Sequence, residues 1–226
     1  MWTIVVAGGS GRRFGGPKQF LELAGRPVVS WSIMAARAAS DGVVLVVPDV
    51  PDANGEGDDP LRDESFRELS SAGADRLVTG GATRADSVRS GLAAVPEHAA
   101  IIVVHDAVRP LAPPSMFAAV VEAVRSGRAD GAIPVLPVSD TLKRISGGMV
   151  RSTEDRDGLV LVQTPQAFVA GTLRAAHRSA GDATDDAGLL ERLGATVCTV
   201  VGDPCNLKLT RPEDLAMAEV FLESAR

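Results

Sequence analysis

Short apolar runs alternate with amphipathic segments along almost the whole chain, and this rhythm constrains the fold more than any other feature. The apolar runs are rich in β-branched residues and predict strands over residues 4–7, 43–47, 76–79, 101–104, 132–136, 160–163 and 196–200. The amphipathic segments predict helices over residues 28–39, 61–72, 85–94, 114–126, 171–179, 186–193 and 212–223. This order predicts an α/β fold with a mostly parallel sheet, helices on both faces, and a ligand site beyond the carboxyl ends of the strands.

The segment from residue 142 to residue 161 interrupts that rhythm. Two short polar runs flank Gly147 and Gly148, which predicts a β-hairpin with a two-glycine turn. We therefore expect one domain over residues 1–226, with a protruding arm at about 138–161 inserted in it.

Length and charge narrow the classes of function. The 226 residues are enough for one domain with a substantial core. A net charge of −6 argues against nucleic acid as a partner, because nucleic-acid-binding domains usually carry a basic surface. No apolar run approaches the roughly 18 residues of a membrane span, and no signal peptide is evident, so we expect no membrane association. Cys198 and Cys205 fit no metal-binding spacing, and we expect a reduced, cytoplasmic protein.

A glycine-rich loop follows the first predicted strand. Gly8, Gly9 and Gly11 allow backbone N–H groups to converge on an anion, because glycine tolerates positive φ and has no Cβ that blocks the approach. Arg12, Arg13 and Lys18 lie in the loop or beside it. A backbone nest with nearby cations predicts a site for several phosphates.

The loop matches neither of two common phosphate-binding motifs. A Walker A loop ends in Gly-Lys-Ser/Thr, whereas Lys18 stands between Pro17 and Gln19. The dinucleotide fingerprint places its third glycine one residue before Gly15. The arginines of the loop suit a polyphosphate better than the pyrophosphate of a dinucleotide.

A second group of candidate residues follows the predicted strand at 101–104. A carboxylate at the end of a buried strand is costly unless a cation or a metal pairs with it, so Asp106 is a candidate contact for Mg²⁺ or a ribose. Arg109 is a candidate for gripping the phosphate of an acceptor. His105 is expected to be structural, because a phosphate oxygen is already ionised near neutral pH and needs no base.

Six motifs, in order and spread over most of the chain, resemble one family. They are A-G-G-S-G-R-R-F with P-K-Q at 7–19, G-G-A-T-R-A-D-S-V at 80–88, H-D-A-V-R-P at 105–110, P-V-S-D-T-L-K with D-R-D-G-L at 137–159, Q-T-P-Q at 163–166 and N-L-K-L-T-R-P-E-D-L at 206–215. The set resembles the sugar-phosphate nucleotidyltransferases and, within them, is most similar to the 2-C-methyl-D-erythritol 4-phosphate cytidylyltransferase family. The resemblance implies a Rossmann-like, mostly parallel sheet of nucleotidyltransferase (glycosyltransferase-A) type.

The resemblance also implies the nucleotide contacts. CTP would contact Ala7, Gly8, Gly9, Gly11, Gly81, Ala82, Ser87 and Asp106. Of these, Gly81, Ala82 and Ser87 would face the cytosine, with a backbone contact at Ala82. Mg²⁺ or another divalent cation would bridge the triphosphate near Asp106. By themselves, the segments at 80–88 and 183–187 predict helix N-termini, and we assign 183–187 a structural role only.

The acceptor contacts are implied in the same way. Thr141, Arg156, Thr164 and Lys208 would bind methylerythritol phosphate, together with Arg109. Arg156, with Thr141 as a second candidate, would reach across from a partner chain, because in this family the arm embraces a second subunit of a homodimer. Lys208 is expected in an alternating strand just before the last helix, where a lone lysine is usually solvated surface.

The implied reaction transfers CMP from CTP to 2-C-methyl-D-erythritol 4-phosphate, giving 4-diphosphocytidyl-2-C-methyl-D-erythritol and pyrophosphate for non-mevalonate isoprenoid biosynthesis. Arg13 and Lys18 would stabilise the α-phosphate and the leaving group, and Arg156 and Lys208 would hold the acceptor phosphate. Two alternatives remain open at this point: a ribitol 5-phosphate cytidylyltransferase, and a non-catalytic CTP sensor on the same scaffold.

Overall fold

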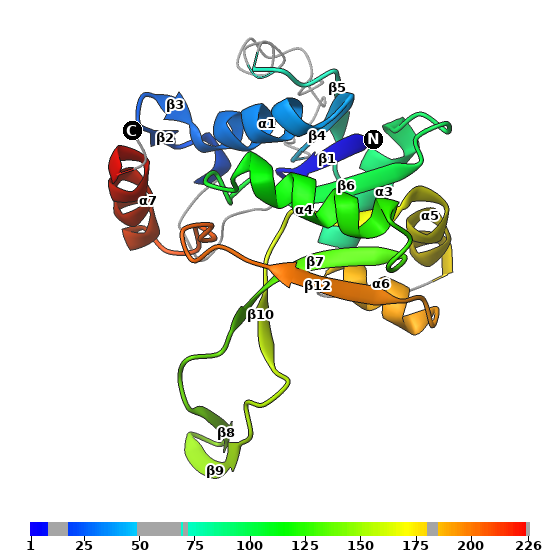
Figure 1. Ribbon diagram of the computed structural model, residues 1–226. Coiled ribbons are helices and arrows are strands. Elements are labelled where there is room, and N and C mark those ends of the chain that lie inside the picture. The colour runs from blue at the N-terminus through cyan, green and yellow to red at the C-terminus, as the bar shows by residue number, and fades with distance from the viewer. Residues whose placement is uncertain (9–17, 49–68, 70–71, 180–184, 225–226) are drawn as a thin grey trace.

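The computed structural model describes residues 1–8, 18–48, 69, 72–179 and 185–224. An eight-stranded sheet forms its centre, with the strand order β10-β7-β11-β6-β1-β4-β5 and with β12 paired to β7 (Figure 1). The strands of this sheet are β1 (Trp2–Val6), β4 (Gly42–Val47), β5 (Arg76–Thr79), β6 (Ile101–Asp106), β7 (Gly131–Pro137), β10 (Val160–Val162), β11 (Gln166–Val169) and β12 (Val197–Val201). The neighbours β6, β1, β4 and β5 are parallel, and β11 runs antiparallel between β6 and β7.

Helices cover both faces of the sheet (Figure 1). They are α1 (Val28–Ala39), α3 (Arg84–Ala94), α4 (Pro114–Arg125), α5 (Ala170–Ser179), α6 (Asp186–Arg192) and α7 (Glu213–Ser224), and a 3-10 turn η1 spans Lys18–Phe20. Val5 belongs to the core cluster that includes residues of α1 and α4, whereas the adjacent Ile4 belongs to the cluster that includes residues of α3, α5 and α6. Both side chains are fully buried, which explains why the central strands are continuously apolar.

The predicted rhythm is confirmed within the described residues. Each predicted strand is present with ends shifted by no more than two residues, and six of the seven predicted helices are present with ends shifted by no more than one. The seventh, at 61–72, lies largely outside the described residues. Within the central sheet, β11 is the strand that the sequence interpretation misses, because its apolar run of three residues directly follows the site motif at 163–166. The short strands β2 and β3 are not predicted either.

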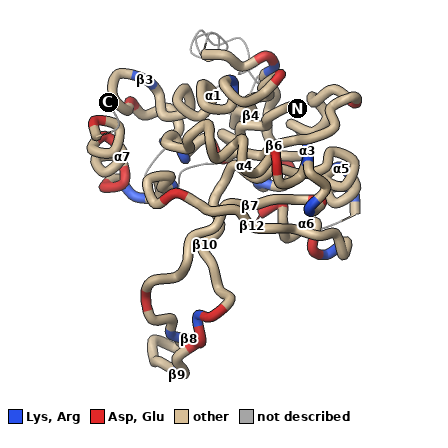
Figure 2. Tube along the Cα trace, in the orientation of Figure 1, with Lys and Arg blue, Asp and Glu red and all other residues tan. Residues whose placement is uncertain are grey.

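A two-stranded hairpin of β8 (Leu142–Ser146) and β9 (Met149–Glu154) projects from the body beyond β7 and β12 (Figure 1). Ser146 pairs with Met149, and the turn residues Gly147 and Gly148 have φ of 58° and 75°. Both values lie in the left-handed region, which is why this two-residue turn needs glycine at both positions. Acidic and basic residues occur close together in sequence along the arm (Figure 2).

A smaller hairpin joins β2 (Glu22–Leu23) and β3 (Arg26–Pro27) ahead of α1. Among the described helices, none combines the length and the apolar character that crossing a membrane requires.

Candidate active site

The carboxyl ends of β1 and β6 meet at one edge of the sheet. Val6 pairs with Asp106 in the parallel register, and the N–H of Ala107 donates to the carbonyl of Val6 at 3.0 Å. Ala7 and Gly8 continue the chain beyond β1, so the start of the glycine-rich loop lies at the same edge as Asp106. This is the edge at which the strand order predicts a ligand.

Two glycines bring this edge close to α3. A Cβ at Gly8 would lie 2.9 Å from Ser87 Oγ, and a Cβ at Gly80 would lie 2.7 Å from the same atom. Because neither residue has a side chain, the backbones that follow β1 and β5 can approach one buried hydroxyl from two sides. The spacing of the loop and α3 therefore depends on glycine at both positions.

The residues predicted to face the cytosine lie in this corner. Gly81 and Ala82 are exposed, whereas Ser87 is buried. The N–H of Gly81 donates to Ser87 Oγ at 3.2 Å, and the Ser87 hydroxyl donates to the carbonyl of Thr83 at 3.1 Å. Ser87 therefore fixes the backbone that leads to Gly81 and Ala82.

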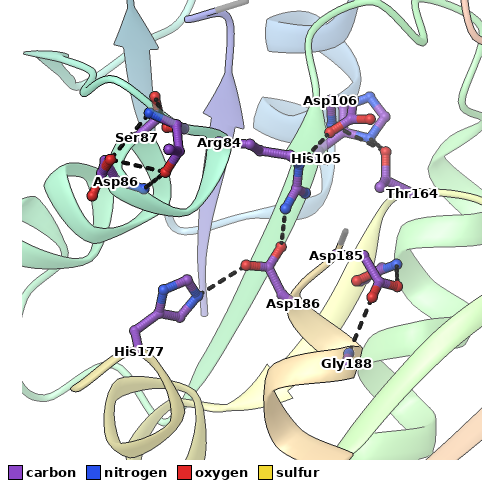
Figure 3. A network of polar contacts seen from close by, with 12 residues as sticks. Arg84, Asp86, Ser87, His105, Asp106, Thr164, His177, Asp185, Asp186 and Gly188 are labelled. Atoms are coloured by element: carbon purple, nitrogen blue, oxygen red, sulfur yellow. Dashed lines mark hydrogen bonds and ion pairs between the residues drawn. The ribbon is translucent and has the colours of Figure 1, made fainter. Parts of the chain in front are cut away.

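A capping box begins α3 directly beside this corner. The N–H of Asp86 donates to Thr83 Oγ1 at 3.1 Å, and the N–H of Thr83 donates to Asp86 Oδ2 at 3.0 Å. These reciprocal bonds make Arg84 the first residue of the helix. Its side chain points to the end of β6 (Figure 3).

Asp106 lies between two cations. Its Oδ1 accepts a hydrogen bond from Arg84 Nε at 3.3 Å, and its Oδ2 accepts one from Lys208 Nζ at 2.7 Å. Burial acts to raise the pKa of Asp106, but Arg84 and Lys208 outweigh it and hold this pKa well below its usual range. Asp106 is thus an ionised carboxylate with a 10% exposed side chain, and Lys208 is 43% exposed.

Hydrogen bonds to the β10–β11 connection position the segment that carries Lys208. Gln163 Nε2 donates to the carbonyl of Asp203 at 2.8 Å, and Asn206 Nδ2 donates to the carbonyl of Thr164 at 2.9 Å. The expectation of an alternating strand around Lys208 is wrong, because β12 ends at Val201 and residues 202–209 form a short turn followed by an irregular segment. The side-chain amides act there together with single backbone bonds, such as the one from the N–H of Leu209 to the carbonyl of Val108.

Thr164 and His105 form a buried pair behind Asp106 (Figure 3). His105 Nε2 lies 3.2 Å from the carbonyl of Arg109, which can only accept, so this nitrogen carries the proton. Nδ1 then accepts from the Thr164 hydroxyl at 3.2 Å, while Thr164 Oγ1 accepts from the N–H of Asp106 at 3.0 Å. These bonds fit the structural role expected of His105. They also mean that the hydroxyl hydrogen of Thr164 is already donated to His105 Nδ1.

Arg109 is buried and donates to backbone carbonyls. Its Nη1 donates to Asn206 O at 2.8 Å and its Nη2 donates to Val162 O at 3.4 Å, while Nε has no hydrogen-bond partner within the described residues. Burial lowers the pKa of Arg109, and Asp106 acts in the opposite direction. The structure thus places Arg109 under the Lys208 segment, with two of its nitrogens already bonded.

The arm carries Thr141 and Arg156, and both are exposed. Thr141 lies directly before β8, and Arg156 lies between β9 and β10, where its Nη1 donates to the carbonyl of Ser139. Within one chain, the contacts of the described residues bring Asp106, Thr164 and Lys208 together but do not bring Arg156 to them.

Lys18 begins η1, immediately after the part of the loop that carries Gly9, Gly11 and Arg13. Those three residues lie outside the described residues. The neighbouring Gln19 is buried, and its Nε2 donates to the carbonyl of Ala7 at 2.7 Å. This bond holds η1, which begins at Lys18, beside the end of β1.

The residues at this edge fit a metal ion that is held mainly by substrate. No cluster of three or more His, Cys, Asp or Glu side chains suited to a metal occurs in the described part of the chain. Mg²⁺ commonly binds one or two carboxylates together with substrate phosphates, and Asp106 supplies an ionised carboxylate whose oxygens each accept one hydrogen bond. Asp106 could therefore contact such an ion without a dedicated metal cage.

Sequence reasoning misses three residues that complete this site. Arg84 Nη1 also donates to Asp186 Oδ2 at 2.8 Å, and His177 Nε2 donates to Asp186 Oδ1 at 2.9 Å. Arg84 stands inside a motif that gives it no role, and residues 183–187 by themselves predict only a helix start. A second aspartate after the capping Asp185 is the one available hint, since a single cap needs only one.

Comparison with known proteins gives one consistent result. The family model described as 2-C-methyl-D-erythritol 4-phosphate cytidylyltransferase matches residues 1–224. A protein of that name from Nocardia farcinica is 42% identical over 226 residues, covering 98% of this chain and 93% of the relative. A bifunctional enzyme IspD/IspF from Nitratidesulfovibrio vulgaris is 43% identical over 230 residues, covering 96% of this chain, and the chain spans 57% of its length. A crystal structure of 2-C-methyl-D-erythritol 4-phosphate cytidylyltransferase from Thermus thermophilus matches with a TM-score of 0.77 and 33% identity, covering 99% of this chain and 98% of that one.

Proposed function

Because the chain belongs to the 2-C-methyl-D-erythritol 4-phosphate cytidylyltransferase family, we propose that it transfers CMP from CTP to 2-C-methyl-D-erythritol 4-phosphate. An oxygen of the acceptor phosphate attacks the α-phosphorus of CTP in line, the bond to the β-phosphate breaks, and pyrophosphate leaves. The product is 4-diphosphocytidyl-2-C-methyl-D-erythritol, an isoprenoid precursor. The family match does not favour ribitol 5-phosphate as the acceptor.

The main difficulty of this reaction is electrostatic, because two phosphate groups that repel each other must come into contact. The observation that carries the proposal is the position of Lys208, whose Nζ is held 2.7 Å from Asp106 at the edge where β1 opens into the glycine-rich loop. An acceptor phosphate at this edge would meet the ammonium group of Lys208, which is partly exposed and can turn from Asp106 to the phosphate.

The nucleotide side of the site would be built by the loop and by the start of α3. Backbone N–H groups of the loop, with Arg13 and Lys18, would surround the triphosphate, and these cations would stabilise the charge that develops on it. Gly81 and Ala82 offer backbone groups to the cytosine, and Ser87 fixes their position. A bound Mg²⁺ near Asp106 would neutralise part of the phosphate charge.

The arm would complete the site of a second copy of the chain. Large apolar side chains are exposed along it and along β10, a pattern typical of a surface that another chain covers. They are Ile145, Met149, Val150, Leu159, Val160, Leu161 and Val162. A homodimer that buries these residues would place Arg156, and with it Thr141, against the acceptor phosphate of the partner.

We also place the reaction in the cytoplasm. Both cysteines are free, and reduced thiols are the rule in that compartment.

An acceptor panel tests the proposed function. Purified protein is incubated with Mg²⁺, with one of CTP, UTP or ATP, and with methylerythritol 4-phosphate or ribitol 5-phosphate, and released pyrophosphate is measured. We expect the highest kcat/KM for CTP with methylerythritol 4-phosphate. A higher value with ribitol 5-phosphate would reassign the acceptor, and CTP binding without pyrophosphate release from any pair would make the protein a sensor.

A further inference from the structure

Five polar side chains form a continuous series of contacts, here named the charge series: His177, Asp186, Arg84, Asp106 and Lys208. Successive members are joined by contacts of 2.9, 2.8, 3.3 and 2.7 Å. Figure 3 shows the first four, with Arg84 between the two carboxylates and His177 on the far side of Asp186. The members come from α5, α6, α3, β6 and the segment after β12, so the series connects five separate parts of the fold.

We propose that Arg84 is a positioning residue for nucleotidyl transfer and that Asp186 and His177 hold its guanidinium from behind. Arg84 acts through Asp106, whose orientation decides where Lys208 rests before the acceptor arrives. This inference rests on the proposed function, because it assigns Lys208 to the acceptor phosphate.

The position of the Arg84 guanidinium is set mainly from the Asp186 side. The contact from Nη1 to Asp186 is 2.8 Å, whereas the contact from Nε to Asp106 is 3.3 Å. The side chain of Asp186 is 1% exposed and both of its oxygens accept hydrogen bonds, so it does not meet substrate. A buried carboxylate of this kind is stable only with its cation in place.

Asp186 is itself held on two sides. It is the first residue of α6, where the free N–H groups of the helix favour a negative charge. His177 Nε2 donates to its other oxygen, and the His177 side chain is 2% exposed. His177 Nδ1 has no hydrogen-bond partner within the described residues, so the bond to Asp186 is the polar contact that orients this ring.

Removal of the Asp186 charge frees the guanidinium to turn toward Asp106 or toward solvent. Asp106 then moves with it, and Lys208 loses its fixed resting position. Since a displacement of about 1 Å in a reacting group can cost about 100-fold in rate, we expect Asp186→Asn to lower kcat about 10- to 100-fold while the KM for each substrate changes less than about threefold. Arg84→Lys keeps the charge but not the planar fork that spans two carboxylates, so it is expected to lower kcat to a similar extent.

A milder pair of variants tests the same idea where Asp186→Asn fails to fold. His177→Gln keeps an N–H donor near the position of Nε2, and His177→Leu removes the donor at similar volume. We expect kcat within about twofold of the parent protein for His177→Gln and about three- to tenfold lower for His177→Leu. The control is Asp75→Asn, which weakens the hydrogen bonds that Asp75 Oδ2 accepts from Arg37 Nη1 and from the N–H of Val43. These bonds lie outside the charge series, so this variant is expected to lower the melting temperature without changing kcat.

A spectroscopic readout separates this inference from the proposed function. The sequence contains three lysines, at positions 18, 143 and 208, so reductive methylation with ¹³C-formaldehyde gives few resonances, and Lys208→Arg assigns that of Lys208. We expect the Lys208 resonance to shift in Asp186→Asn and His177→Leu but not in His177→Gln or Asp75→Asn. This result is readable even if no acceptor is turned over, an outcome that would defeat the proposed function alone.

The inference is overturned if folded Asp186→Asn keeps both the parental kcat and the parental Lys208 resonance. It is also overturned if His177→Gln is as impaired as His177→Leu, or if Asp75→Asn loses as much kcat at the same loss of melting temperature, because either result would indicate a general packing effect.

Discussion

At the scale of single residues, Lys18 tests the nucleotide side of the site. It follows the glycine-rich loop, and its neighbour Gln19 is bonded to the carbonyl of Ala7 at the end of β1. A cation placed to act on the leaving pyrophosphate works in the transition state, so we expect Lys18→Ala to lower kcat about 10²- to 10³-fold and to leave the KM for the acceptor nearly unchanged. Steady-state kinetics measure both constants, with Arg125→Ala on the exposed face of α4 as the matched loss of one cation. A near-normal kcat would remove Lys18 from this role.

His105 gives a prediction about stability and pH. Burial lowers the pKa of His105 from 6.5 to about 4, the neighbouring Asp106 opposes this shift, and Arg109 reinforces it. The unfolded chain therefore binds a proton near pH 6.5 that the folded protein binds only near pH 4, so the free energy of unfolding decreases as the pH falls through this window. The full contribution of this one group is about 3 kcal/mol.

We expect His105→Asn, which does not titrate, to show a shallower loss of stability between pH 6.5 and pH 4 than the parent protein. Denaturant unfolding at several pH values measures the two slopes, and the other titrating groups cancel in the comparison. Parallel slopes would mean that His105 is protonated equally in the folded and unfolded chains.

The sequence predicts single site residues better than it predicts the contacts between those residues. Asp106 is a candidate because it stands at the end of a buried strand, whereas Lys208 is a candidate only through the family resemblance. The link from Arg84 to Asp186 is not predicted, because the two residues are 102 positions apart and no local pattern encodes their meeting. Burial decides that these charges must pair, and burial is a property of the folded chain.

At the scale of elements, the difference between local pattern and long-range contact also explains why β11 is not predicted. The central predicted strands β4 and β6 carry long apolar runs, whereas β11 is four residues long, begins with a glutamine and directly follows a site motif. Its strand geometry comes from pairing with β6 on one side and β7 on the other. Context of this kind overrides local propensity, so such a strand is not visible in the sequence.

Helix α3 offers an element-scale prediction about packing. A Cβ at Gly91 would lie 2.6 Å from Ile4 Cγ2 and 3.1 Å from Val46 Cγ2, both in the core beneath the helix. In contrast, Gly171 in α5 has open space around its Cβ position. The gain in helix propensity from Gly to Ala is about 1 kcal/mol, but crowding in a packed core costs about 1–3 kcal/mol.

We therefore expect Gly91→Ala to lower the free energy of unfolding by about 1 kcal/mol and Gly171→Ala to raise it by about 0.5 kcal/mol. Denaturant titration at one pH compares the two variants. Stabilisation by Gly91→Ala would show that α3 can lift from the sheet, and in that case the position of Arg84 at its first turn would be less fixed than proposed.

At the scale of the whole molecule, the arm bears on whether each active site is built from one chain or from two. Asp106, Thr164 and Lys208 meet within a single chain, whereas Arg156 lies in the arm, between β9 and β10. The hairpin exposes large apolar side chains, and contiguous exposed apolar surface commonly marks a protein–protein contact. If two chains exchange arms, each site contains residues from both, and catalysis depends on dimerisation.

Mixing two inactive variants tests this arrangement directly. Lys208→Met inactivates the body of a chain and Arg156→Ala inactivates its arm, so each variant alone is expected to lose most of its kcat. In a mixed dimer, one site combines an intact body with an intact arm, and random pairing places about half of the chains in mixed dimers, so co-refolded variants should recover about a quarter of the parental activity. The activity is measured as pyrophosphate release at saturating CTP and acceptor. If Arg156 acted within its own chain, every site in the mixture would carry one of the two substitutions, and no activity would return.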